Sequence, residues 1–157
     1  MAIAQSLERF LDKRGVSYDL AMHEQTGCSV ATARAGAIPE TNLAKGVLVK
    51  RKNGYVLAIV PASCDVQLDT LGGVVGQPVG LATEEEVSEV FSDCVPGSVP
   101  PVGAAYGLAS VLDDHLEGLN DIYFEGGDHC TLVHLRGSEF HRLMAGVPHF
   151  RIGEERR

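Results

Sequence analysis

Residues 46–60 read GVLVKRKNGYVLAIV, two β-rich runs that are joined by a short polar turn. Asn53 and Gly54 predict a tight hairpin turn, because both residue types tolerate the positive φ angles that such a turn needs. The run from Tyr55 to Val60 is apolar on both faces, which is typical of a central strand. This stretch therefore predicts an antiparallel hairpin whose second strand lies inside a sheet.

Upstream of the hairpin, residues 3–14 carry apolar side chains at the spacing of one helix face. These side chains belong to Ile3, Leu7, Phe10 and Leu11. Gly15 should end this helix, since glycine readily takes the left-handed conformation found after a last turn. A short strand is expected at residues 16–20, and a second short helix is expected between an N-cap at Ser29 and an end at Gly36.

Downstream of the hairpin, strands alternate with helices and one irregular loop. Thr83 and Glu86 have the spacing of a capping box that opens a helix, and Ser138 should cap the last helix. Residues 94–103 contain three prolines and two glycines, which predicts a loop. Further strands are predicted over residues 109–112, 121–125 and 130–135. This order indicates a single α+β domain over residues 1–157, built on a mixed sheet that is closed or strongly curved.

Composition and charge exclude several classes of protein. The sequence has no run of about 18 apolar residues, so no membrane span is expected. Its N-terminus has no basic stretch leading into an apolar one, which favours a cytoplasmic location. The net charge of −8 argues against an evenly basic, DNA-binding surface. A local basic group is still present, formed by Lys45, Lys50, Arg51 and Lys52.

Cysteine spacing gives no sign of a metal or redox pair. The four cysteines are Cys28, Cys64, Cys94 and Cys130, none closer than 30 positions to the next. Reduced and mostly buried thiols are expected in a cytosolic protein. Cys130 and His134 could share one face of a strand, but they lack further ligands at zinc-site spacing. The sequence therefore predicts no metal and no cofactor.

Three separate features could carry chemistry. Lys45 precedes a hydrophobic strand, where it is either a solvated end residue or an anchor for a phosphate or carboxylate. The loop from Gly97 to Pro101 either holds its N–H groups toward an anion or simply connects two elements. His129 follows two glycines, and it either holds a substrate group or water, or faces solvent together with Asp128. No serine-hydrolase elbow, metalloprotease helix or phosphate-binding P-loop motif is present.

Taken in order, these features resemble the YbaK/prolyl-tRNA-synthetase-associated family of aminoacyl-tRNA editing domains. The segments that carry the resemblance are residues 44–49, 97–103, 111–116, 122–129 and 135–140. The resemblance implies a mixed, barrel-like sheet flanked by helices. It also implies hydrolysis of the ester between a wrong amino acid and the 3′ adenosine of a tRNA.

The resemblance further implies a set of site residues and partners. Lys45 would anchor the terminal phosphate, the Gly97 to Pro101 loop would fix the aminoacyl group, and His129 would contact the aminoacyl or ribose end. Further substrate contacts are expected from Gly46, Ser98, Val99, Pro100, Gly127 and Asp128. A positioned water would attack the ester, without a metal or a covalent nucleophile. The implied partners are the acceptor end of aminoacyl-tRNA and either prolyl-tRNA synthetase or the elongation machinery.

Two residues bear on the substrate. Gly46 stands where many relatives carry a polar residue. The presence of His129 makes the chain more similar to relatives that clear alanine or another small residue from tRNA-Pro. A small pocket would exclude the correct amino acid by size, as in double-sieve editing. Two rival hypotheses remain: a non-catalytic module that binds tRNA or a synthetase, and an unrelated small-molecule or metal-dependent hydrolase.

Overall fold

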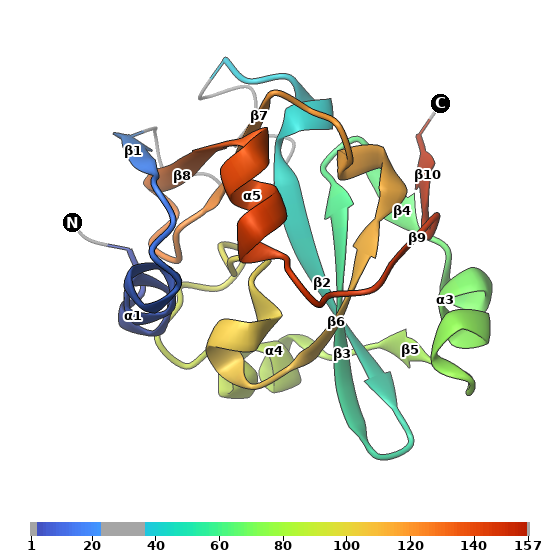
Figure 1. Ribbon diagram of the computed structural model, residues 1–157. Coiled ribbons are helices and arrows are strands. Elements are labelled where there is room, and N and C mark those ends of the chain that lie inside the picture. Colours follow the sequence, from blue (N-terminus) through green and yellow to red (C-terminus); the bar gives the residue numbers. More distant parts are fainter. Residues whose placement is uncertain (1–2, 23–36, 157) are drawn as a thin grey trace.

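The predicted hairpin is the centre of the fold in the computed structural model, which describes residues 3–22 and 37–156 (Figure 1). Strands β2 (Ala44–Arg51) and β3 (Gly54–Pro61) pair in antiparallel register along their whole length. On its other side β3 pairs in parallel with β6 (Ala109–Asp113). The hairpin and the central position of its second strand are therefore confirmed.

The described strands form three sheets, which confirms a mixed α+β fold. The five-stranded sheet has the order β5-β2-β3-β6-β9, with β5 at Gly80–Leu81 and β9 at His149–Phe150. A three-stranded sheet has the order β1-β8-β7, with β1 at Asp19–Met22, β7 at Asp121–Glu125 and β8 at Thr131–Arg136. The pair β4 (Cys64–Val66) and β10 (Gly153–Glu155) makes the third. Among the described residues these sheets do not close into a barrel, because β2 and β7 are joined only by the parallel bridge between Leu43 and Tyr123.

The helices follow the sequence pattern in part. They are α1 (Gln5–Arg14), α3 (Leu68–Val75), α4 (Glu84–Val90) and α5 (Gly137–Leu143), with short 3-10 turns η1 (Glu40–Asn42), η2 (Gly103–Tyr106) and η3 (Asp114–Leu116). Gly15 ends α1 at a φ of 65°, and Thr83 and Glu86 form the predicted capping box. The helix expected between Ser29 and Gly36 lies outside the described residues.

Two expectations about local structure were wrong. Ser138 does not cap α5, because the helix already begins at Gly137, whose N–H donates to the Asn120 carbonyl and whose Cα packs against the Leu119 carbonyl. The strand expected at residues 16–20 begins only at Asp19. Backbone N–H groups before it are used elsewhere, since Ser17 donates to the Glu139 carboxylate.

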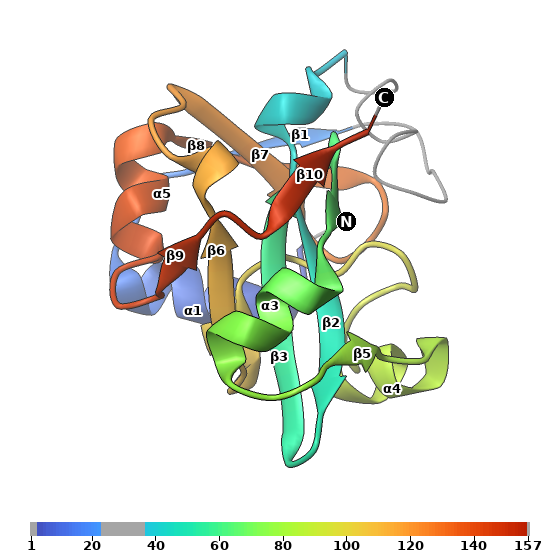
Figure 2. The ribbon, with the colours of Figure 1, turned by 90° about the vertical axis from the view of Figure 1, so that its right-hand side faces the viewer.

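The core lies on both faces of the five-stranded sheet. Figure 2 shows α3 in front of this sheet. Leu57 and Ile59 face the core that α1 and α5 cover, whereas Ala58 and Val60 face the core under α3. This alternation follows from the two-residue period of a strand and accounts for the two-sided apolar pattern of β3. Within the described parts of the chain, no helix is long and apolar enough to cross a membrane.

Candidate active site

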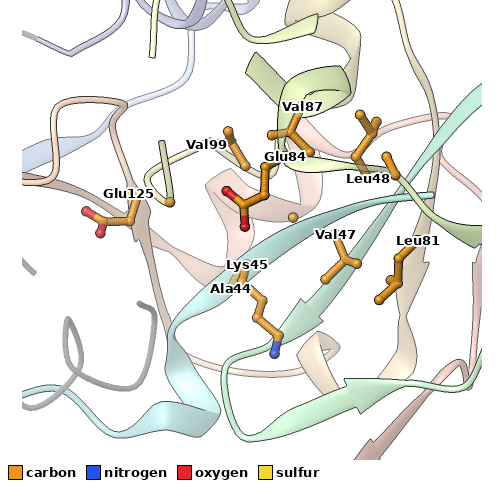
Figure 3. A pocket seen from close by; sticks show the side chains of 12 residues that line it. Ala44, Lys45, Val47, Leu48, Leu81, Glu84, Val87, Val99 and Glu125 are labelled. Carbon is orange, nitrogen blue, oxygen red and sulfur yellow. The ribbon is translucent and has the colours of Figure 1, made fainter. Parts of the chain in front are cut away.

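A cavity of about 280 Å³ opens where the two larger sheets separate (Figure 3). Its walls come from β2, from the segment around β5 and the start of α4, from the proline loop, and from the end of β7. The lining residues are Ala44, Lys45, Gly46, Val47, Leu48, Leu81, Ala82, Glu84, Val87, Gly97, Val99 and Glu125. Of the residues predicted from the sequence, the structure therefore brings Lys45, Gly46, Gly97 and Val99 together in one cavity.

The floor of this cavity is an open edge of β2. Leu43, just before β2, is bridged to Tyr123 of β7, and Val49 and Lys50 of β2 pair with β5. Between these points, no strand in the described chain pairs with the edge of β2 that faces away from β3. The Leu48 carbonyl faces that side, since it accepts a hydrogen bond from the Ala82 N–H at 3.0 Å. Alternate residues of a strand direct their backbone groups the same way, so the N–H and C=O of Gly46 face the cavity.

Gly46 is a glycine because the proline loop crosses directly over it. A Cβ atom at this position would lie 3.2 Å from the Cα of Pro101 and 3.1 Å from a methyl group of Leu57. The Leu57 side chain could move, but the backbone of Pro101 could shift only together with its loop. A larger side chain at position 46 therefore requires a loop that lies farther out. Pro101 does not line the cavity; it sets the position of the cavity wall.

The proline loop is held by its own hydrogen bonds. Ser98 is fully buried, and its hydroxyl donates to the Val95 carbonyl at 2.7 Å, while Val95 donates its N–H to Gly127 at 2.7 Å. Gly97 has a φ of 85°, in the region that favours glycine. Gly97 and Val99 line the cavity, and among the described residues no acceptor takes the N–H of either one.

His129 lies behind the loop and does not line the cavity. Its side chain is buried, and Nε2 donates to the Pro96 carbonyl at 2.7 Å. The carbonyl can only accept, so this bond fixes the hydrogen on Nε2 and leaves Nδ1 facing Glu125, 3.4 Å from Oε2. His129 therefore positions the residue that precedes Gly97, and its burial excludes the alternative in which it faces solvent.

Gly126 and Gly127 pack closely against the N-terminal segment at Ala4. The carbonyl of Gly126 accepts from Ala4, and a Cβ on Gly127 would lie 2.9 Å from the Ala4 side chain. Asp128 closes the same turn, since its carboxylate accepts from the N–H groups of Cys130 and Thr131. Burial alone would raise the pKa of Asp128, but these hydrogen bonds outweigh it and hold the pKa below its usual value. Neither Gly127 nor Asp128 lines the cavity, and neither do Ser98 and Pro100.

Lys45 occupies a half-buried position on the side of β2 opposite Glu84 (Figure 3). Burial lowers the pKa of its ammonium, and the nearby Arg156 guanidinium lowers it further, against the opposing effect of Asp65. Within residues 3–22 and 37–156, no carboxylate lies within salt-bridge distance of it. Lys45 is thus a cation at the cavity whose charge is uncompensated by a close ion pair, which suits an anionic ligand.

Lys50 does not extend this positive charge into one patch with Lys45. Lys45 and Lys50 are five residues apart, so a regular strand turns them to opposite faces. Lys50 instead forms a salt bridge of 2.8 Å with Glu86. This bond, followed by those from Thr83 and Tyr55, holds the pKa of Glu86 at about 2.

Glu84 is a cavity residue that the sequence analysis did not identify. It begins α4, and its carboxylate extends from the helix toward β2 in Figure 3. Acidic residues are common in the first turn of a helix, where they offset the helix dipole, so the sequence carried no signal of another role. Glu125 was also missed, although it lies in the segment that includes His129.

The three cysteines that the structure describes do not line the cavity. Cys64 is buried, Cys94 and Cys130 are half-buried, and all three are free thiols; Cys28 lies outside the described residues. Burial raises the pKa of Cys94 to about 12. His134 stacks on Tyr123 and bonds to Asp121 at 2.8 Å, so its contacts are accounted for by its own sheet.

Comparison with known proteins identifies the family and the fold of the chain. Residues 23–143 match the family described as the aminoacyl-tRNA editing domain. A crystal structure of "a putative trans-editing enzyme for prolyl tRNA synthetase" is 25% identical with a TM-score of 0.82, over 96% of both chains. The hypothetical protein APE2540 is 23% identical with a TM-score of 0.84, over 96% of this chain and all of that one, which shows the shared fold. No curated protein gives a significant match.

The family match includes β2, β5, α4, the proline loop and β7, which are the elements that build the cavity. It covers well over half of the 157 residues. The chain therefore belongs to the aminoacyl-tRNA editing domain family, whose function is aminoacyl-tRNA editing.

Proposed function

We propose that the protein is a trans-acting deacylase that hydrolyses the ester of mischarged aminoacyl-tRNA, with alanyl-tRNA-Pro or another small aminoacyl-tRNA-Pro as its substrate. The observation that carries this proposal is the cavity between β2 and the proline loop. Its volume of about 280 Å³ is at the lower end for ligand pockets and suits a small aminoacyl group.

The backbone donors of the loop suit the ester carbonyl. Gly97 and Val99 line the cavity, and their N–H groups have no protein acceptor among the described residues. Donors that are already fixed can stabilise the negative charge that develops on a carbonyl oxygen during hydrolysis. His129 supports this arrangement through Pro96, so its role is to position the loop.

The cavity offers Glu84 to the amino end of the substrate. An aminoacyl ester carries an α-amino group that is largely protonated near neutral pH. The Glu84 carboxylate extends into the cavity from the start of α4 (Figure 3). It would bind the α-ammonium group and thereby orient the ester toward the loop, while Lys45 would hold the phosphate of the terminal nucleotide.

Hydrolysis would use a positioned water molecule as the nucleophile. The described residues that line the cavity include no serine, threonine, cysteine or histidine side chain. Ser98, the nearest hydroxyl in the loop, is buried and donates to the Val95 carbonyl. An aminoacyl ester is intrinsically reactive, so orientation and oxyanion stabilisation can account for the reaction without a metal ion.

We also propose that residues 1–157 form one editing domain, although the family match covers only residues 23–143. Leu7 and Leu11 of α1 are fully buried in the main core, and Ile152 is fully buried in the second. The protein partner would be prolyl-tRNA synthetase or the elongation machinery, either of which could deliver the aminoacyl-tRNA.

The test is a deacylation screen with alanyl-, cysteinyl-, seryl- and threonyl-tRNA. We expect turnover that is fastest with the alanyl ester and that is lost in Lys45→Ala. Lys50→Ala is the matched control, because Lys50 lies on the same strand but does not line the cavity. Equal rates for Lys45→Ala and the unmodified protein would refute the proposed site. Binding of every tRNA without turnover would show a non-catalytic module instead.

A further inference from the structure

A second cluster of reactive side chains lies outside the editing cavity, around the β4–β10 pair. Cys64 of β4 and Glu155 of β10 are direct cross-strand partners, and His115 comes from η3. One donor atom from each of these three residues lies within 4.8 Å of the other two. Three elements that are distant in sequence thus bring a thiol, an imidazole and a carboxylate to one point.

His115 is held by a buried carboxylate. Asp113 is fully buried, and its Oδ2 lies 2.7 Å from Nδ1 of His115. The other oxygen, Oδ1, accepts from the N–H groups of Ile152 and Gly153 at 2.9 Å each, so the carboxylate itself is fixed. This arrangement orients the ring and leaves Nε2 with a lone pair, as in histidines that bind metals with carboxylate support.

Cys64 adds a buried thiol without a strong partner. It is fully buried, and the contact recorded for its Sγ in the described chain is the Ser63 hydroxyl at 3.9 Å. His115 and Glu155 also line a cavity of about 480 Å³, which gives the cluster access to solvent. The buried thiol, the oriented imidazole and the exposed carboxylate together form a set of possible metal ligands.

We propose that Cys64, His115 and Glu155 bind a Zn²⁺ ion, with Asp113 as the residue that orients His115. Sulfur, nitrogen and oxygen ligands together favour zinc over magnesium or calcium, which prefer oxygen ligands alone. Three protein ligands leave a fourth tetrahedral position for water from the adjoining cavity. Small rotations of the side chains would bring the three donor atoms to coordination distance.

The ion would crosslink the C-terminal strand to the body of the protein. It would join β10 to β4 and η3, beside the Arg156 side chain that bonds to Glu40 and Asp65. None of its three ligands lines the editing cavity. The proposal is therefore independent of the deacylase function and can fail while that function stands.

The test is metal binding measured on the full chain with Zn²⁺ and with Co²⁺ as a spectroscopic probe. We expect one Zn²⁺ per chain and, with Co²⁺, the intense near-ultraviolet band of a cobalt–thiolate bond. Cys64→Ser should abolish this band, whereas Cys94→Ser should keep it. Glu155→Gln should weaken Zn²⁺ binding at least 10-fold, and the exposed neighbour Glu154→Gln should leave it unchanged.

Several results would overturn the proposal. Binding well below one Zn²⁺ per chain, or a cobalt–thiolate band that survives in Cys64→Ser, would place the metal elsewhere or nowhere. If Cys64→Ser fails to fold, the exposed Glu155 position decides the question, because that change does not disturb the core. Equal affinity in Glu155→Gln and Glu154→Gln would then exclude the site.

Discussion

Replacement of His129 tests whether this residue holds the proline loop or acts on the substrate. His129→Ala removes the 2.7 Å bond to the Pro96 carbonyl, at a cost of about 0.5–1.5 kcal/mol. His129 also has a φ of 64°, in the left-handed region, where alanine costs about 1 kcal/mol more than a tolerant residue. The two effects together lower the free energy of unfolding by about 1.5–2.5 kcal/mol.

His129→Asn separates the two contributions, because asparagine tolerates the left-handed region but is too short to replace the bond. We expect the Asn variant to be about 1 kcal/mol more stable than the Ala variant in urea unfolding. Both variants should show a roughly 10- to 100-fold lower kcat/KM in deacylation, since a displaced loop misplaces its N–H groups. Unchanged stability, within about 0.5 kcal/mol, combined with a large loss of kcat would refute the positioning role and indicate direct catalysis.

Four further outcomes are expected. Gly46→Ala should cost about 1–3 kcal/mol in urea unfolding and lower activity, because its Cβ presses on the loop backbone; full stability would contradict this packing. Glu84→Gln should raise KM for aminoacyl-tRNA about 10-fold or more, while Glu85→Gln, outside the cavity, should not. The pKa of Lys45 is lowered from the ordinary lysine value of 10.5, so Lys45 should lose its charge at a lower pH than an ordinary lysine. Binding of a non-hydrolysable, phosphate-bearing substrate analogue should therefore weaken as the pH rises toward 10.5. A constant affinity up to that pH would argue against the phosphate role. The pKa of Glu86 is about 2 against an ordinary 4.5, so its contribution to stability is present above pH 4.5 and is lost as the pH falls toward 2; Glu86→Gln, which keeps the capping box, should flatten the acid side of the stability profile.

The parts of the fold that local rules control could be predicted from the sequence. The position of the hairpin, the end of α1 at Gly15 and the capping box of α4 each depend on residues close together in the chain. The hairpin turn itself lies one residue earlier than predicted, at Lys52 and Asn53, and only Gly54, which begins β3, has a positive φ. Helix α3 could not be predicted in this way, because Gly72 and Gly73 lower its intrinsic helix propensity and packing of Leu71 supplies the stability.

The candidate site shows the same division. Lys45, Gly46, Gly97 and Val99 were predicted as site residues and do line one cavity. The direction of the His129 ring was not predictable, since its partner, Pro96, lies 33 positions away in the sequence. The environment of Lys45 also depends on Arg156, at the far end of the chain. Such contacts are set by tertiary packing and leave no periodic or compositional signal.

The open edge of β2 has a consequence for how this site can change. The N–H of Gly46 belongs to the main chain, so every substitution at that position except proline keeps the donor. A substitution at position 46 instead changes the distance between the proline loop and β2, and this distance sets the volume of the cavity. The hydrogen-bonding groups of the cavity are thus resistant to mutation, whereas its volume is sensitive to a single carbon atom. Substitutions at position 46 can therefore change the substrate specificity without removing the backbone donors on which binding depends.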